Sequence, residues 1–168
     1  MPGPASRQPP DDDTLSAALA ETRAVYAELA SRPVDRGCTG RAECCHFRLT
    51  GRTPQLTRGE ALVLAAGWKA SGRKSLPDRA DGACPLLDPQ NRCLVYAARP
   101  FGCRTHFCAA AGGPLARPTV IDLIRRLEKV DESLRGDGPK PLGQALREAL
   151  AVDTSRRGRS GKNRAPRR

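Results

Sequence analysis

The 168-residue chain is poor in aromatic side chains and contains no long hydrophobic run. Aromatic residues make up 4% of the sequence and hydrophobic residues 39%, which is below the usual apolar share of a soluble domain. The composition therefore predicts one domain with a thin core, which a bound metal or a cross-link would help to hold together. Because no apolar run approaches the roughly 18 residues of a membrane span, we expect no membrane-embedded segment.

The N-terminal segment lacks the features of a secretory signal. Residues 1–13 are rich in proline and end in three aspartates, without the basic start and apolar stretch that such a signal needs. We therefore expect a cytoplasmic protein, since thiols stay reduced in that compartment and clustered cysteines there more often bind metal than form disulfides. The odd number of cysteines, seven, favours the same interpretation because seven cannot all pair within one chain.

Sequence motifs of several common functions are also missing. The chain shows no pattern of a hydrolase triad, a phosphate-binding loop or a dinucleotide-binding fingerprint. Its cysteine spacings fit neither a two-Cys, two-His zinc finger nor a zinc ribbon. These absences leave the cysteines as the main source of functional information, and they leave open whether the protein is an enzyme.

Positive charge is abundant and concentrated at the C-terminal end, where residues 155–168 contain six arginines, one lysine and no acidic residue. This segment is too polar to fold alone and has no aromatic residue for base stacking, which favours a disordered, solubilising tail. The alternative is a weak contact with nucleic acid or another polyanion through the tail.

Hydrophobic periodicity predicts a mainly helical fold. The predicted helices are residues 14–31, 57–70, 118–134 and 141–151, and the second opens with a capping box of Thr57 and Glu60. One short β-hairpin is expected at residues 85–96, around a turn at 88–92. Residues 33–55 and 99–113 show no periodicity, so we expect irregular cysteine-rich loops there.

These elements predict a small, metal-stapled domain over residues 14–152. A disordered N-terminus, residues 1–13, is expected to precede it, and a disordered basic tail, residues 153–168, to follow it.

The seven cysteines form two clusters along the chain. Metal binding requires thiolates that converge on one point at about 2.3 Å, and the short loops rich in glycine, proline and arginine suit that convergence. Because consecutive side chains tend to diverge, Cys44 and Cys45 are expected to serve two different metals, or one to ligate while the other packs or reacts. The candidate metal ligands are Cys38, Cys44, Cys45, Cys84, Cys93, Cys103 and Cys108.

Two histidines and several arginines accompany the cysteines. His106 lies between Cys103 and Cys108 and is a candidate additional ligand, as is His46 beside Cys45. A histidine in such a position more often lies beside a metal site than binds the metal. Arg99 and Arg104 are expected to hydrogen-bond thiolate sulfur and to offset its negative charge.

The second cluster has a specific pattern, which reads Cys84-Pro-Leu-Leu, then Cys93-Leu-Val-Tyr-Ala-Ala-Arg-Pro-Phe-Gly-Cys103-Arg104, then Cys108. This pattern resembles that of the YkgJ-type cysteine-cluster proteins, a family described as zinc- or iron-chelating. The resemblance covers about residues 36–110 and implies metal chelation. The family's first motif, Cys-x2-Cys-x2-Cys-Cys, would start at Cys38, and Arg41 stands at its second cysteine position. His46, His106 or water would then replace the missing thiolate.

The leading interpretation is a cytoplasmic metal-binding protein whose two cysteine clusters close around zinc or iron, with an iron–sulfur cluster as one form of the site. One alternative is an iron–sulfur or thiol-based oxidoreductase, in which Arg99, Arg104 and His106 serve an anionic substrate or Cys44 and Cys45 form a thiol–disulfide switch. A further alternative is a nucleic-acid-binding zinc protein that uses its basic tail. The sequence identifies no protein partner.

Overall fold

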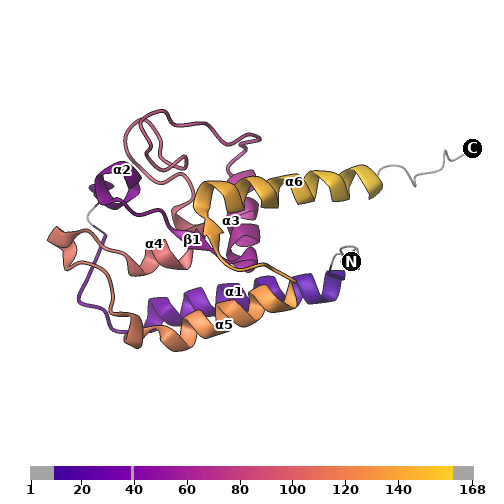
Figure 1. Ribbon diagram of the computed structural model, residues 1–168, viewed down its shortest axis with the longest axis horizontal. Helices are drawn as coiled ribbons and strands as arrows, with labels where there is room; N and C mark the ends of the chain where they lie inside the picture. Colours follow the sequence, from indigo (N-terminus) through magenta and orange to yellow (C-terminus); the bar gives the residue numbers. More distant parts are fainter. Residues whose placement is uncertain (1–9, 39, 161–168) are drawn as a thin grey trace, which may run out of the picture.

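Four long helices form the body of the protein in a computed structural model that describes residues 10–38 and 40–160. The helix α1, Asp12–Ser31, and the helix α5, Ile121–Ser133, lie side by side, and both pack against α3, Arg58–Ala70 (Figure 1). The helix α6, Leu142–Ser160, also packs on α3, which therefore lies at the centre of the fold. The mainly helical class and all four predicted long helices are confirmed.

The helix boundaries differ from the predicted ones where capping or proline decides them. Asp11 caps α1, because its carboxylate accepts a hydrogen bond from the Thr14 backbone N–H at 2.7 Å, so the helix starts at Asp12. Before α5, Pro118 lies in a separate 3-10 turn, Arg117–Thr119. The backbone of α6 continues to Ser160, beyond the predicted end at residue 151. Residues 1–9 and 161–168 of the two predicted terminal segments lie outside the described residues.

Short helices occur in the segments that we expected to be irregular. The first segment contains the 3-10 helix η1, Glu43–Cys45, and the helix α2, Phe47–Thr50. The second segment contains α4, Phe101–Thr105, and η3, Ala109–Ala111, and the 3-10 helix η2, Tyr96–Ala98, lies just before it. Helices of three to five residues complete about one turn, so no repeating hydrophobic pattern can reveal them in the sequence.

The only two strands among the described residues connect distant parts of the chain. In β1, Gln55–Leu56, and β2, Lys140–Pro141, Gln55 lies opposite Pro141 and Leu56 opposite Lys140 in an antiparallel pair. This pairing joins the start of α3 to the start of α6.

The predicted hairpin is reduced to one antiparallel bridge between Leu87 and Cys93. The Asp88 carboxylate holds its turn, because it accepts hydrogen bonds from the backbone N–H groups of Gln90 at 2.9 Å and Arg92 at 2.8 Å. Cys93 is thereby held at the end of a tight, locally stabilised turn.

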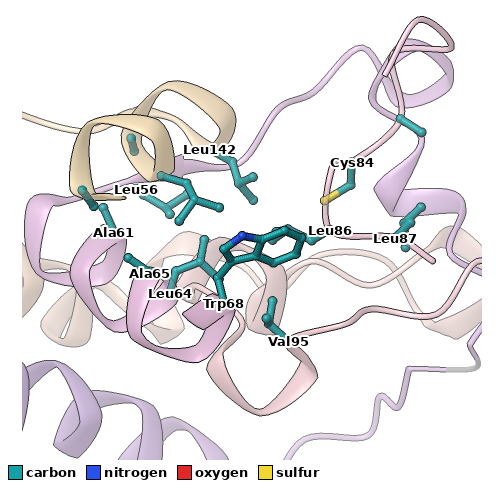
Figure 2. Close-up of a cluster of buried hydrophobic side chains, with 14 residues drawn as sticks. Leu56, Ala61, Leu64, Ala65, Trp68, Cys84, Leu86, Leu87, Val95 and Leu142 are labelled. Carbon is teal, nitrogen blue, oxygen red and sulfur yellow. The ribbon is translucent and has the colours of Figure 1, made fainter. Parts of the chain in front are cut away.

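The main hydrophobic cluster surrounds Trp68, which is 1% exposed, and joins α3, α6 and the segment 83–95 (Figure 2). Cys84 belongs to the same cluster, so one wall of the core is also part of the cysteine-bearing region. Within the described residues, no helix combines the length and the apolarity needed to cross a membrane.

Candidate metal centre

The two cysteine clusters meet at one cavity of about 470 Å³. Residues 38–54 form one part of its wall, and residues 84–106 form the other, with Leu142 of α6 completing it. The described residues contain no disulfide, so the sulfur atoms are present as thiols or thiolates. The cysteines on the wall are Cys38, Cys44, Cys45, Cys84, Cys93 and Cys103.

A second, much smaller cavity of about 30 Å³ shares three of these cysteines, Cys38, Cys44 and Cys103, and adds Cys108. Arg99 and His106 also line both cavities. The structure therefore gathers all seven candidate ligands and one candidate histidine around two neighbouring spaces. His46 lies elsewhere, at the start of α2, where its carbonyl oxygen accepts a hydrogen bond from the Leu49 N–H at 2.9 Å.

Backbone interactions hold the cysteine-bearing segments together. The Cys84 N–H donates a hydrogen bond to the carbonyl oxygen of Cys45 at 2.7 Å, so the two clusters touch directly. Cys103 lies on α4, where its N–H donates to the Pro100 carbonyl oxygen at 3.0 Å. Cys93 is held by the bridge to Leu87.

Cys44 and Cys45 do not diverge as we expected, because their Sγ atoms lie 4.0 Å apart. Both belong to the tight 3-10 turn η1, which follows Ala42 in the left-handed conformation, and this turn brings the two side chains together. In a tetrahedral zinc site with bonds of about 2.3 Å, neighbouring sulfurs are about 3.8 Å apart. The pair therefore has nearly the spacing of one edge of such a site.

The remaining sulfurs are spread over the cavity wall. Within residues 10–38 and 40–160, no three cysteine, histidine or acidic side chains are grouped tightly enough to hold a metal ion. Closing a complete coordination sphere therefore requires inward movement of side chains from the wall, toward the pair formed by Cys44 and Cys45.

The thiols differ in their acidity. A hydrogen bond from Cys45, together with the positive charge of Arg99, lowers the pKa of Cys44 to about 6. The same hydrogen bond and burial raise the pKa of Cys45. Burial raises the pKa of Cys84 to about 12 and also raises the pKa values of Cys93 and Cys103. At neutral pH a metal must therefore displace protons from the buried thiols in order to bind them.

The two predicted arginines have different surroundings. The Arg99 guanidinium stacks over the Tyr96 ring at 3.7 Å and lines both cavities. Arg104 instead supports the backbone, since it donates to the carbonyl oxygens of Arg99 at 2.8 Å and Ala97 at 2.6 Å. Its guanidinium also lies over the Tyr26 ring at 4.4 Å.

Glu60, which the sequence indicates only as part of a helix cap, also positions the segment that carries Cys103. Its Oε1 accepts hydrogen bonds from the Phe101 N–H at 2.7 Å and the Tyr26 hydroxyl at 3.3 Å, while Oε2 accepts from the Thr57 N–H at 3.0 Å. One buried carboxylate therefore connects α1, α3 and α4, and its burial raises its pKa. No sequence pattern signals the contact with Phe101, because the two residues are 41 positions apart.

Comparison with known families supports the interpretation of the motif. The model of the family CxxCxxCC, whose description is "Putative zinc- or iron-chelating domain", matches residues 37–129. The matched region is more than half of the chain and contains all seven cysteines. This is the YkgJ-type family that the second cluster resembles, so the resemblance is confirmed. No curated protein and no solved structure matches the chain.

Proposed function

Because the chain belongs to the CxxCxxCC family of zinc- or iron-chelating domains, we propose that it binds zinc or iron in the cysteine-lined cavity. The observation that carries this proposal is that six cysteines from both clusters line one cavity. Sulfur and imidazole donors suit zinc and iron. Calcium and magnesium prefer oxygen ligands, and the described residues that line the larger cavity include no aspartate or glutamate.

The first metal ion is assigned to Cys44, Cys45, Cys84 and Cys103. Cys44 and Cys45 already have nearly the spacing of a tetrahedral edge. Cys84 is tied to Cys45 by the backbone hydrogen bond, and Cys45 interacts electrostatically with both Cys84 and Cys103. Four thiolates complete the coordination of zinc, and such a site stabilises the fold rather than catalysing a reaction.

The other candidate ligands lie beside this set. Cys38, Cys108 and His106 line the small cavity, and Cys93 lines the large one. They supply donors for a second ion or replace a member of the first set. If the metal is iron accompanied by sulfide, thiolates of the same cavity hold an iron–sulfur cluster, which would supply electron-transfer chemistry.

The decisive experiment is a measurement of zinc, iron and sulfide content, with a visible absorption spectrum, on protein purified without oxygen. We expect at least one equivalent of metal, and a coloured, sulfide-containing sample would identify an iron–sulfur protein. Cys84→Ser and Cys103→Ser should lose most of the metal, whereas His46→Gln, outside both cavities, should keep it. Circular dichroism of each variant separates lost ligation from lost folding.

Metal-free protein that also fails to take up added zinc or ferrous iron would contradict metal chelation. The close approach of Cys44 and Cys45 would then favour the thiol-based oxidoreductase. In that case a mild oxidant should produce a disulfide between these two residues, detected by mass spectrometry.

A further inference from the structure

The cysteine-lined cavity is far larger than a metal ion requires. Its volume of about 470 Å³ falls within the range of about 300–1,000 Å³ that is typical of small-molecule binding sites. Much of its remaining wall is apolar, contributed by Phe47, Leu86, Val95, Tyr96 and Leu142 among others. The sulfur atoms are only part of the wall, and the apolar side chains beside them line the rest of the same space.

Apart from the Cys44 thiolate, the charged side chains that line this space are arginines. Arg52, Arg92 and Arg99 line the cavity, whereas none of the described lining residues is acidic. The Arg92 Nε donates to the Asp88 carboxylate at 2.8 Å, which holds this arginine in place beside the turn. Three guanidinium groups on the wall of one cavity favour an anion within it.

Arg99 is the side chain at which we place the anion. Its Nε is buried and has no hydrogen-bond partner among the described residues, and an unpaired buried donor is costly. Stacking on Tyr96 limits the orientations of the guanidinium at the cavity wall. A planar guanidinium fork matches the oxygen atoms of a carboxylate or a phosphate, and a rotation of Arg99 toward the cavity would give this donor a ligand oxygen as its partner.

We propose that the cavity binds a small organic oxyanion, a carboxylate or a phosphate ester with an apolar body, whose charged group is held by Arg99. Arg52 adds positive charge, Arg92 is already paired with Asp88, and the apolar wall contacts the body of the ligand. The inference uses the cavity of the proposed function but does not require that the metal be present, since its evidence is the arginines, the volume and the unpaired donor.

The test is isothermal titration calorimetry with benzoate and phenyl phosphate, which distinguish a carboxylate from a phosphate. Benzamide is the neutral ligand of the same shape. Each titration is carried out on the protein as purified and again after treatment with a chelator. The metal content of both samples is measured separately, so failure of metal chelation and failure of anion binding are recorded independently.

We expect at least one of the two anions to bind and benzamide to bind more weakly. Arg99→Gln should weaken anion binding about tenfold, since it removes a charge-assisted hydrogen bond. Arg52→Gln should weaken it less, because Arg52 is exposed, and it provides a second test if Arg99→Gln unfolds. Arg125→Gln, an exposed position on α5, removes the same charge elsewhere and should leave the affinity unchanged.

Three results would overturn the proposal. The first is the absence of binding by both anions in both samples. The second is binding of benzamide as tightly as the tighter-binding of the two anions, which would show an apolar cavity without anion selectivity. The third is equal anion binding by the Arg125→Gln protein and the folded arginine variants of the cavity. If Arg99→Gln then lowered only the metal content, Arg99 would interact with the cysteine thiolates and not with a bound organic anion.

Discussion

The backbone N–H of Cys84 donates a hydrogen bond to the carbonyl oxygen of Cys45, with 2.7 Å between nitrogen and oxygen. Cys45 belongs to the first cysteine cluster and Cys84 to the second, so this bond is the point at which the two clusters are joined. Because it uses backbone atoms, the bond does not depend on the ionisation of either thiol. The cysteine-bearing segments can thus be held together before a metal is bound.

Zinc binding should release about three protons at pH 7.5. Cys45, Cys84 and Cys103 have raised pKa values and are protonated at that pH, whereas Cys44, with a pKa of about 6, is already ionised. Protons compete with zinc for the buried thiols, so the affinity should rise as the pH is raised from 6.5 to 8.

Calorimetry in two buffers with different heats of ionisation counts the released protons. Release of about four protons would show that Cys44 is a thiol in the metal-free protein. Release of one or none would contradict the four-cysteine assignment.

Glu60→Gln should destabilise the fold by about 1–3 kcal/mol, as expected when buried donors lose a partner. The amide can accept through only one oxygen, whereas both Glu60 oxygens accept hydrogen bonds from backbone N–H groups. The free energy of unfolding in urea measures the effect. Glu128→Gln, at an exposed position on α5, is the matched control and should change stability by less than about 0.5 kcal/mol.

The same variant tests whether Glu60 positions the metal centre. Phe101, which donates to Glu60, begins α4, and Cys103 lies two residues further along that helix. We therefore expect Glu60→Gln to weaken zinc binding under conditions in which it is fully folded. Unchanged zinc affinity in the folded variant would limit Glu60 to a role in stability.

Arg41→Cys should strengthen zinc binding by about tenfold or more, because it restores the thiolate of the family motif. Arg41 lines the small cavity together with Cys38, Cys108 and His106, so the new sulfur would enter a group of existing donors. The substitution would remove an exposed ion pair with Glu43, at 3.7 Å.

Competition with a chromophoric chelator measures the affinity of the Arg41→Cys protein. Leu49→Cys adds a thiol at an 81% exposed position of α2 and is the control for a nonspecific gain. An equal increase in both variants would show that the small cavity has no special role.

Gly67→Ala should destabilise the protein, although alanine is the better helix former. A Cβ atom at Gly67 would lie 2.5 Å from the Ala98 Cβ, so α3 and the segment before Arg99 would have to separate. We expect a loss of about 1–3 kcal/mol, typical of overpacking. Gly143→Ala on α6 meets only ordinary contacts and should stabilise by up to about 1 kcal/mol. Thermal unfolding measures both effects. A lower unfolding temperature for Gly67→Ala and a higher one for Gly143→Ala would confirm the difference. Stabilisation of both variants would refute the close contact.

Features that depend on residues close together in the sequence could be predicted from the sequence. Periodicity identified the four long helices, and the spacing of Thr57 and Glu60 identified the start of α3. The cysteine spacing around Arg99 and Cys103 identified the family. The short helices were missed, since one turn leaves no period, and the approach of Cys44 to Cys45 was missed because side-chain directions in a tight turn depend on its backbone conformation.

The sequence by itself determined the donor atoms of the candidate site, because their chemical types and their spacing along the chain are properties of the sequence. Only the tertiary structure decided which of them meet. The bond between Cys84 and Cys45, the anchoring of Phe101 by Glu60 and the unpaired Nε of Arg99 all arise where distant segments pack together. Such contacts depend on the summed packing of many side chains, so no local pattern encodes them.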